Sequence, residues 1–188
     1  MALRTITEFK SKLSGGGVRP NLFEVELNFP TTLNGQSINN EKEIARFLVK
    51  AAALPASNIT PVDVPFRGRI LKLAGERTFD TWTITVLNDV DFKIRTAFEQ
   101  WMNGINKLST ATGSTNPTEY HQDGRVFQLN RSGEVIREYK FFGLFPTNIS
   151  QIDLSMDTTD TVQEFTVEMQ VLYYELIGSS INGAPAIS

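Results

Sequence analysis

The residue types that most often perform chemistry in proteins are nearly missing from this sequence. The chain of 188 residues contains one histidine, His121, and no cysteine. Without cysteine there can be no disulfide, no thiolate nucleophile and no cysteine-ligated metal, and one histidine cannot build the usual zinc site. We therefore expect a surface or hydrogen-bonding role for His121, and we expect neither a metal nor a cofactor.

Carboxylates are the other candidates for catalysis, and they come in evenly spaced pairs on predicted strands. The pairs are Glu24 with Glu26 and Glu164 with Glu168. Even spacing places both members on one face of a strand, which is typical of a solvated surface, and no Gly-x-Ser-x-Gly or Ser-x-x-Lys arrangement supplies a nucleophile. Asp153 begins a turn-like stretch of aspartates that lacks the spacing of an EF-hand calcium loop. We therefore predict no catalytic residue.

Composition and charge exclude further classes of protein. The formal net charge is −3 and the isoelectric point is about 5.3, which disfavours a protein that grips nucleic acid through a broad basic face. Hydrophobic residues make up 40% and charged residues 21%, close to the averages for globular domains. The sequence shows neither a signal peptide nor a run of about 18 apolar residues. We expect a soluble protein of a reducing cytoplasm that does not bind membranes.

The elements that would position these residues are mostly strands. Apolar residues alternate with threonines from Trp82 to Val86, which predicts a strand with Trp82, Ile84 and Val86 facing the core. The opposite face is a row of threonines. Strands that face open water more often carry lysine and glutamate, so a short, neutral, β-branched row indicates a crowded or shared surface.

The rest of the chain predicts further strands and one long helix. Residues 43–53 fit a helix or a strand, and 31–40 read as a loop. The predicted strands cover residues 21–29, 61–66, 69–75, 120–130, 133–145, 147–156 and 161–176. Asn88 and Asp89 can cap a helix over 90–108, with Ile94, Phe98, Trp101, Ile105 and Leu108 on one stripe. This pattern predicts a β-rich α+β fold, an antiparallel β-sandwich or partly closed barrel with one flanking helix.

Two segments are predicted to extend from this domain. Residues 1–18 form an N-terminal arm, with a short amphipathic helix over 3–13 and a hinge at Gly15–Gly17. Residues 61–75 form a hairpin whose first strand contains two prolines, which suits a projecting element, and a projecting hairpin with a basic, aromatic tip favours contact with another protein. We assign 19–176 to the main domain and 177–188 to a C-terminal tail.

Several linked motifs, in order, resemble a known family. They are Arg19-Pro-Asn-Leu-Phe-Glu-Val-Glu26, Ala53-Leu-Pro55, Val64-Pro-Phe66 with Gly68-Arg69, Ala74-Gly75 with Arg77-Thr-Phe-Asp80, Trp82-Thr83, Asn88-Asp89 and Gly143-Leu-Phe-Pro-Thr-Asn148. Their order and spacing, from about 19 to 174, resemble the tail tube proteins of contractile-tailed bacteriophages of the T4-like kind. The segments 31–40 and 177–188 are extra relative to that pattern.

The resemblance implies a structural, non-enzymatic protein of the virion, assembled in the host cytoplasm. In the family, subunits form hexameric rings that stack into a hollow tube inside a contractile sheath, and strands of all subunits line the channel as a continuous barrel. Implied partners are further copies of the chain, the sheath, the baseplate, the tail terminator, and a tape-measure protein in the lumen. Double-stranded DNA passes through without adhering. The arm and the hairpin are then the candidates for contacts between subunits or rings, namely Leu3, Ile6, Phe9, Val64, Phe66, Arg67 and Arg69.

A channel for DNA restricts the chemistry of its wall. A basic wall would bind the polyanion and stall it, whereas a neutral or acidic wall leaves weak, repulsive contacts. We therefore expect polar and acidic side chains to face the lumen. The candidates are Glu24, Glu26, Thr81, Thr83, Thr85, Asp153, Glu164 and Glu168.

Two other functions remain open at this point. The inner tube of a related contractile injection system would share the fold but deliver proteins. A monomeric β-barrel binding module or enzyme would need a deep pocket and a convergent set of acids, bases or nucleophiles, and the sequence offers none.

Overall fold

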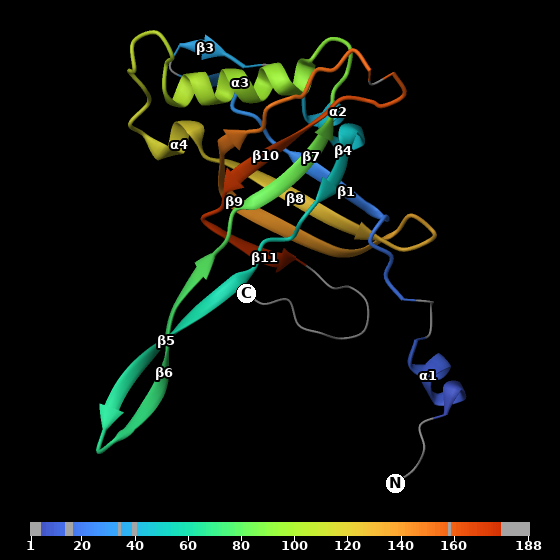
Figure 1. The fold of residues 1–188 in the computed structure, drawn as a ribbon, viewed down its shortest axis with the longest axis vertical. Helices are drawn as coiled ribbons and strands as arrows, with labels where there is room; N and C mark the ends of the chain where they lie inside the picture. Colours follow the sequence, from blue (N-terminus) through green and yellow to red (C-terminus); the bar gives the residue numbers. More distant parts are fainter. Residues whose placement is uncertain (1–4, 14–16, 34, 39–40, 158, 178–188) are drawn as a thin grey trace.

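One curved antiparallel sheet forms the body of the molecule (Figure 1). The computed structural model describes residues 5–13, 17–33, 35–38, 41–157 and 159–177. In this part of the chain, the sheet has seven strands in the order β1–β8–β9–β10–β7–β4, and β11 also pairs with β9. The strands are β1 (Phe23–Leu27), β4 (Val49–Ala52), β7 (Trp82–Leu87), β8 (Gln122–Leu129), β9 (Val135–Ile149), β10 (Glu164–Gln170) and β11 (Tyr173–Ile177).

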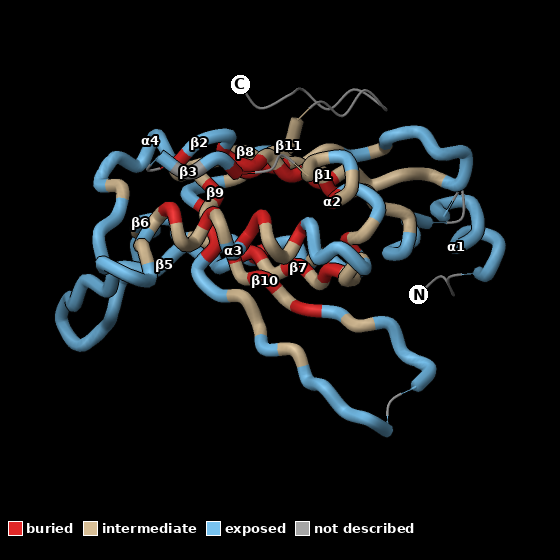
Figure 2. Tube along the Cα trace, turned by 90° about the horizontal axis from the view of Figure 1, so that it is seen from above, coloured by how far each residue is buried: buried red, intermediate tan, exposed pale blue. Residues whose placement is uncertain are grey.

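The sheet forms two layers because the long strand β9 belongs to both. Its first part pairs with β8 and β11, and its last part pairs with β10. Buried residues lie between the layers (Figure 2), where the Trp82 indole stacks on the Phe141 ring with centroids 4.4 Å apart. Trp82, Ile84 and Val86 are all fully buried, which confirms the predicted inward face of β7.

The prediction of separate strands over 133–145 and 147–156 is wrong. β9 runs without a break from Val135 to Ile149, through Pro146, and residues 150–163 carry no strand in their described part. Proline cannot donate a ladder hydrogen bond, so it normally marks an edge or a bulge. β9 tolerates Pro146 because β8 pairs with β9 only as far as Leu144, so Pro146 lies on a free edge, beside a bulge against β10.

Helix α3 (Lys93–Ile105) lies across one end of the two layers (Figure 1). The helix begins three residues later than predicted, and its N-cap position is Phe92, which makes no side-chain cap hydrogen bond. The predicted capping by Asn88 or Asp89 is therefore wrong, although Asp89 Oδ1 accepts a hydrogen bond from the Lys93 backbone N–H at 3.0 Å. The predicted extension to Leu108 is wrong: that side chain is 94% exposed. The chain turns back after Ile105, where Lys107 N–H donates to Thr112 O at 2.8 Å.

Aromatic side chains fix α3 to the short helix α4 (Pro117–Tyr120) and to the segment that follows β1. Trp101 Nε1 donates to the Tyr120 carbonyl at 3.0 Å, and the rings of Phe29 and Phe98 meet edge to face at 5.1 Å. Tyr120 ends α4. The segment predicted as a loop over 31–40 contains a small hairpin, β2 (Thr32–Leu33) and β3 (Gln36–Ser37), because the buried Leu33 packs where Gly104 leaves room on α3.

The ambiguous segment 43–53 is both a helix and a strand. α2 (Lys42–Leu48) is followed directly by β4, and α2 is held against β1 by an ion pair between Lys42 and Glu26 at 2.6 Å and another between Arg46 and Glu24. The expectation of one flanking helix is therefore incomplete. The described part of the chain contains no helix long and apolar enough to span a membrane.

A long hairpin projects from the end opposite α3 (Figure 1). It consists of β5 (Ser57–Phe66) and β6 (Arg69–Phe79), so it is longer than the predicted 61–75. Its two-residue turn places Arg67 at φ 46° and Gly68 at φ 80°, the left-handed backbone that a tight hairpin turn requires. The hairpin prediction is confirmed.

Candidate assembly surfaces

One outer face of the sheet gathers four of the predicted lumen residues. Thr85 lies directly opposite Thr166, and Thr83 lies opposite Glu168. Since paired residues on antiparallel strands share a face, we define the threonine wall as the face formed by Ala51, Thr83, Thr85, Leu87, Asn148, Glu164, Thr166 and Glu168. It spans β4, β7, β10 and the end of β9.

The threonine wall is almost neutral. Lys50 Nζ and Glu164 Oε2 form an ion pair at 2.5 Å, so these two charges offset each other. Among the residues that the structure describes, Glu168 has no cation beside it. The wall therefore carries a single uncompensated negative charge and no uncompensated positive one.

The other predicted lumen residues lie outside the wall. Glu24 and Glu26 are ion-paired with α2 and belong to the opposite layer. Asp153 lies in the loop that joins β9 to β10, where its carboxylate accepts a hydrogen bond from Gln151 at 3.3 Å, so its predicted strand position is wrong. Thr81 is exposed in the step between the hairpin and β7.

The outer face of the opposite layer is charged, and we call it the charged layer. It is formed by β1, β8, β11 and the first part of β9, and four of its carboxylates form ion pairs with neighbouring cations. Arg125 pairs with Glu138 at 3.2 Å across β8 and β9, and Lys140 pairs with Asp123 at 3.2 Å. The sequence alone did not reveal these pairs, although Lys42 and Arg46, four residues apart on α2, match the alternation of Glu24 and Glu26.

The hairpin has one apolar face without a partner among the described residues. Val62 lies opposite Leu73 and Val64 opposite Leu71, and these four side chains are between 39% and 57% exposed. The tip continues this face with Phe66, which is 66% exposed and lies under the Arg67 guanidinium at 5.4 Å. Arg69 is the cross-strand partner of Phe66, so the predicted contact residues of the hairpin cluster on and around this tip.

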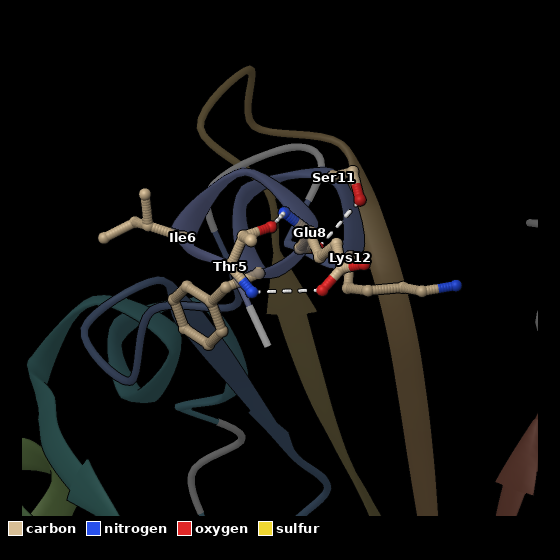
Figure 3. Close-up of a pocket in the computed structure, with 6 residues that line it drawn as sticks. Thr5, Ile6, Glu8, Ser11 and Lys12 are labelled. Carbon is tan, nitrogen blue, oxygen red and sulfur yellow. Dashed lines mark hydrogen bonds between the residues drawn. The ribbon is translucent and has the colours of Figure 1, made fainter. Parts of the chain in front are cut away.

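The N-terminal arm presents a second exposed apolar surface. Helix α1 (Ile6–Lys12) begins with a capping box, in which Thr5 N–H donates to Glu8 Oε2 at 3.1 Å and Glu8 N–H donates to Thr5 Oγ1 at 3.4 Å (Figure 3). Ile6 is 73% and Phe9 63% exposed. The third predicted contact residue, Leu3, and most of the predicted glycine hinge lie outside the described residues.

His121 lies where β9 passes from one layer to the other. Its imidazole stacks on the Phe145 ring with centroids 5.4 Å apart, and burial lowers its pKa from the ordinary value of 6.5. Within the described ranges, no group of three or more histidine, aspartate or glutamate side chains could hold a metal ion. Among the described residues, the hollow drawn in Figure 3 is lined by Thr5 and by residues of α1.

Comparison with known proteins shows the family to which this chain belongs. The model of the family described as phage tail tube protein matches residues 18–176. The chain belongs to the phage tail tube protein family. It is 34% identical over 163 residues to the tail tube protein gp19 of Enterobacteria phage T4, covering 86% of this chain and 93% of that one. It is 28% identical over 177 residues to the tail tube protein of Serratia phage KSP90, covering 93% and 97%.

Several solved structures share the fold. A chain in the sheath-tube complex of an extracellular contractile injection system matches with a TM-score of 0.57 at 14% identity, covering 88% of this chain and 95% of that one. Chains in the anti-feeding prophage cap and baseplate match with TM-scores of 0.58 and 0.60 at 13% identity. They cover 94% and 88% of this chain and 93% and 98% of those chains. At these identities the likeness shows the fold alone.

Membership of the family decides between the functions left open by the sequence. The chain is a structural component of a phage tail tube and not an enzyme. The phage relatives are far closer in sequence than the injection-system chains, at 34% against 14% identity, which favours the phage tail over the injection system.

Proposed function

We propose that this tail tube protein assembles into hexameric rings, that the rings stack into a tube, and that the threonine wall lines the channel through which the phage genome leaves. The observation that carries this proposal is the contrast in charge between the two outer faces. The wall holds one uncompensated carboxylate, from Glu168, and its other side chains are neutral or paired.

The charge of the wall suits the passage of DNA. Duplex DNA carries about one negative charge per 1.7 Å of its axis, so any row of unpaired lysine or arginine in a channel would bind it strongly. Threonine, alanine and asparagine offer no such charge, and Glu168 repels the phosphates. The predicted lumen residues Thr83, Thr85, Glu164 and Glu168 stay within this proposal, and we withdraw Glu24, Glu26, Thr81 and Asp153 from it.

Ring formation would give the open strand edges of the sheet a partner. Continuing the sheet from subunit to subunit removes the open strand edges that make isolated sheets aggregate. Head-to-tail contacts of this kind close when the rotation between subunits divides a full turn. A closed ring of six is supported by the 6-fold symmetry under which the similar baseplate structure was determined.

Stacking of rings would use the apolar surfaces that the monomer leaves exposed. The hairpin projects away from the body by most of its length (Figure 1), and its apolar face requires a partner if it is not to face water. We assign Val64, Phe66, Arg67 and Arg69 to contacts with the next ring. The arm residues Leu3, Ile6 and Phe9 are assigned to contacts between subunits on the same reasoning.

The other proposed partners are those named for similar structures or implied by the family. The similar chains come from complexes described as sheath-tube, tube-terminating cap and baseplate. We propose the corresponding sheath, terminator and baseplate proteins as partners of this chain. A tape-measure protein in the lumen and double-stranded DNA complete the set.

Electron microscopy of the purified chain at rising concentration tests this proposal. We expect rings and tubes, and a chain that stays monomeric at every concentration would overturn it. The double variant Phe66→Ala, Arg69→Ala should fold normally but form fewer and shorter tubes. Val135→Ala, at a half-exposed position on β9, is the matched control and should assemble as the unchanged chain does. Equal tube formation by the hairpin variant would show that the hairpin assignment is wrong.

A further inference from the structure

We infer that the long loop between β9 and β10, residues 150–163, receives the hairpin tip of a subunit in the adjacent ring. This inference rests on the proposed stacking of rings and names the surface against which the hairpin tip packs. Three observations carry it. The loop lies at the end of the subunit opposite the hairpin, it exposes apolar side chains around a hollow, and its charge is opposite to that of the hairpin tip.

The loop and the hairpin lie at opposite ends of the subunit. The hairpin extends from one end, and residues 150–163 lie at the other end, beside α3 (Figure 1). Identical rings that stack head to tail all point in the same direction along the tube. A hairpin that reaches toward the adjacent ring therefore meets the end of that ring from which no hairpin extends. The loop belongs to this end.

The loop leaves the body on the side of the threonine wall. Figure 2 shows it extending from the layer of β10 and β7, away from β8 and β1. In the proposed tube the charged layer is the outer one, so the loop does not lie on the surface that meets the sheath. A subunit of the adjacent ring is therefore the partner that this geometry brings to the loop.

Hydrogen bonds hold both ends of the loop against the body. At its end, Asn88 N–H donates to the Gln163 carbonyl at 2.9 Å, and Asn88 Nδ2 donates to Gln163 Oε1 at 2.8 Å. At its start, Ser150 N–H donates to the Thr166 carbonyl at 2.8 Å, and Arg95 Nη1 donates to the Ser150 carbonyl at 3.4 Å. The fold thus sets the position of the loop in advance, which reduces the entropy lost on docking.

The described part of the loop exposes large apolar side chains. Leu154 is 84%, Met156 100% and Val162 67% exposed. Leu154 and Met156 also line a hollow, together with Thr161 and Gln163 from the other limb of the loop. Clustered exposed apolar side chains on a soluble protein mark a site of contact. An open hollow between such side chains suits an exposed aromatic ring, and the hairpin tip carries one.

The loop is acidic where the hairpin tip is basic. Three of its carboxylates form no ion pair with any described residue, namely those of Asp153, Asp157 and Asp160. At the tip, Arg67 lies over the Phe66 ring and Arg69 is the cross-strand partner of Phe66. Neither guanidinium has a carboxylate partner within the described ranges. Docking therefore pairs charges that the separate subunit leaves unpaired, and such complementarity selects the right partner.

Charge reversal followed by rescue tests this pairing. In the loop variant, Asp153→Lys and Asp157→Lys place two cations opposite the basic tip. We expect this variant to fold and to form rings, while the concentration needed for tubes rises at least tenfold, because like charges in contact repel each other. Adding Arg67→Glu and Arg69→Glu to the same chain makes the two surfaces complementary again. This fourfold variant should form tubes at a concentration near that of the unchanged chain.

Negative-stain electron microscopy of each variant counts rings and tubes. The control variant carries Glu134→Lys and Glu175→Lys, which change the net charge equally at two exposed positions outside both surfaces, and it should form tubes as the unchanged chain does. A loop variant that forms tubes equally well would show that the loop is not the receptor. A loss of tubes that the hairpin changes do not restore would show that the loop meets another surface. If the unchanged chain itself forms neither rings nor tubes, the proposed function fails.

Cysteine cross-linking tests the contact directly, because the chain has no cysteine of its own. The double variant Phe66→Cys, Met156→Cys places one thiol on the hairpin tip and one on the loop. These two elements lie at opposite ends of one subunit (Figure 1), and a disulfide needs Cα atoms within about 7 Å. Any cross-link must therefore join different copies. Oxidised tubes should give a ladder of linked chains on a non-reducing gel.

The matched control for cross-linking is Phe66→Cys, Leu108→Cys. Leu108 is 94% exposed and follows α3 at the same end of the subunit, so it tests a second surface that the hairpin tip could meet. This pair should give no ladder. A ladder from the Leu108 pair and none from the Met156 pair would move the receptor to the end of α3 and overturn the inference, while the proposed stacking of rings would stand.

Discussion

The charged layer and the threonine wall are two outer faces of the same sheet, and they differ mainly in charge. Both cover the same buried core, in which Trp82 from one layer stacks on Phe141 from the other. The charged layer holds four carboxylates in ion pairs, such as Glu138 with Arg125. The wall has one such pair at its edge and short neutral side chains elsewhere. The inner faces of both layers must be apolar because they pack in the same core. The difference in charge between the outer faces therefore reflects the different surroundings of these faces in the assembled tube.

The largest effect should come from the core that the two faces share. Trp82→Ala removes a fully buried indole, and we expect the free energy of unfolding to fall by about 3–5 kcal/mol, the usual range for such truncations. Chemical denaturation followed by circular dichroism measures this loss. Both layers should unfold together, because the Trp82–Phe141 stack joins them.

Trp82→Phe is the matched control for this change. The indole Nε1 is buried without a hydrogen-bond partner in the described structure, and an unsatisfied buried donor is itself unfavourable. Phenylalanine keeps an aromatic ring beside Phe141 and removes that donor, so its loss of stability should be much smaller. Equal losses for the two variants would contradict the role given to the stack.

A positive charge placed on the wall should reverse its behaviour toward DNA. Thr85→Lys adds one uncompensated cation per subunit at the centre of the wall, where Thr85 faces Thr166. We expect assembled tubes of this variant to retain short duplex DNA at least tenfold more than unchanged tubes at about 50 mM salt, and to release it at about 500 mM. Filter retention of labelled DNA measures the effect.

Thr115→Lys separates the position of the charge from its presence. Thr115 is an exposed residue in the loop before α4, so this variant has the same net charge as Thr85→Lys but leaves the wall neutral. DNA retention should stay near the unchanged level. Equal retention by both variants would show that the wall is not the surface that DNA meets.

Breaking an ion pair of the charged layer should have a small effect. The side chains of Arg46 and Glu24 are 49% and 34% exposed, and exposed pairs of this kind contribute at most about 1 kcal/mol because water and salt screen them. Arg46→Ala should therefore lower the free energy of unfolding by less than that, and the difference should shrink in high salt. A loss of several kcal/mol would mean that α2 depends on this pair.

The smallest effect is a pH dependence at the junction of the two faces. Burial lowers the pKa of His121 in the folded state below its unfolded value of 6.5, so the unfolded chain binds the proton more readily. The folded state is therefore not destabilised by protonation of His121 above about pH 6.5. Its free energy of unfolding decreases as the pH falls from there toward the folded pKa of His121. His121→Gln should remove this part of the pH dependence, and since the chain has no other histidine, comparing the two denaturation profiles isolates it.

The alternation of side chains allowed much of both faces to be predicted from sequence. A strand has a period of two, so Trp82, Ile84 and Val86 had to share one face and the threonines the other, and the hairpin followed from two extended segments around Arg67 and Gly68. These are local relations, set within a few residues. The same holds for the core stripe of α3. Its prediction was correct as far as Ile105, and the predicted last turn to Leu108 was wrong.

The pairing of distant segments could be settled only by the tertiary structure. Pro146 predicts a break when read locally, yet β9 continues through it because β8 has already separated from that edge. Glu24 and Glu164 look alike in sequence, but one is bound by Arg46 under α2 and the other lies on the wall beside Lys50. The sequence by itself determined which residues face outward. Which outward face is neutral, and which strand edges stay open, depends on contacts between residues as far apart as Lys50 and Glu164, and local periodicity carries no information about them.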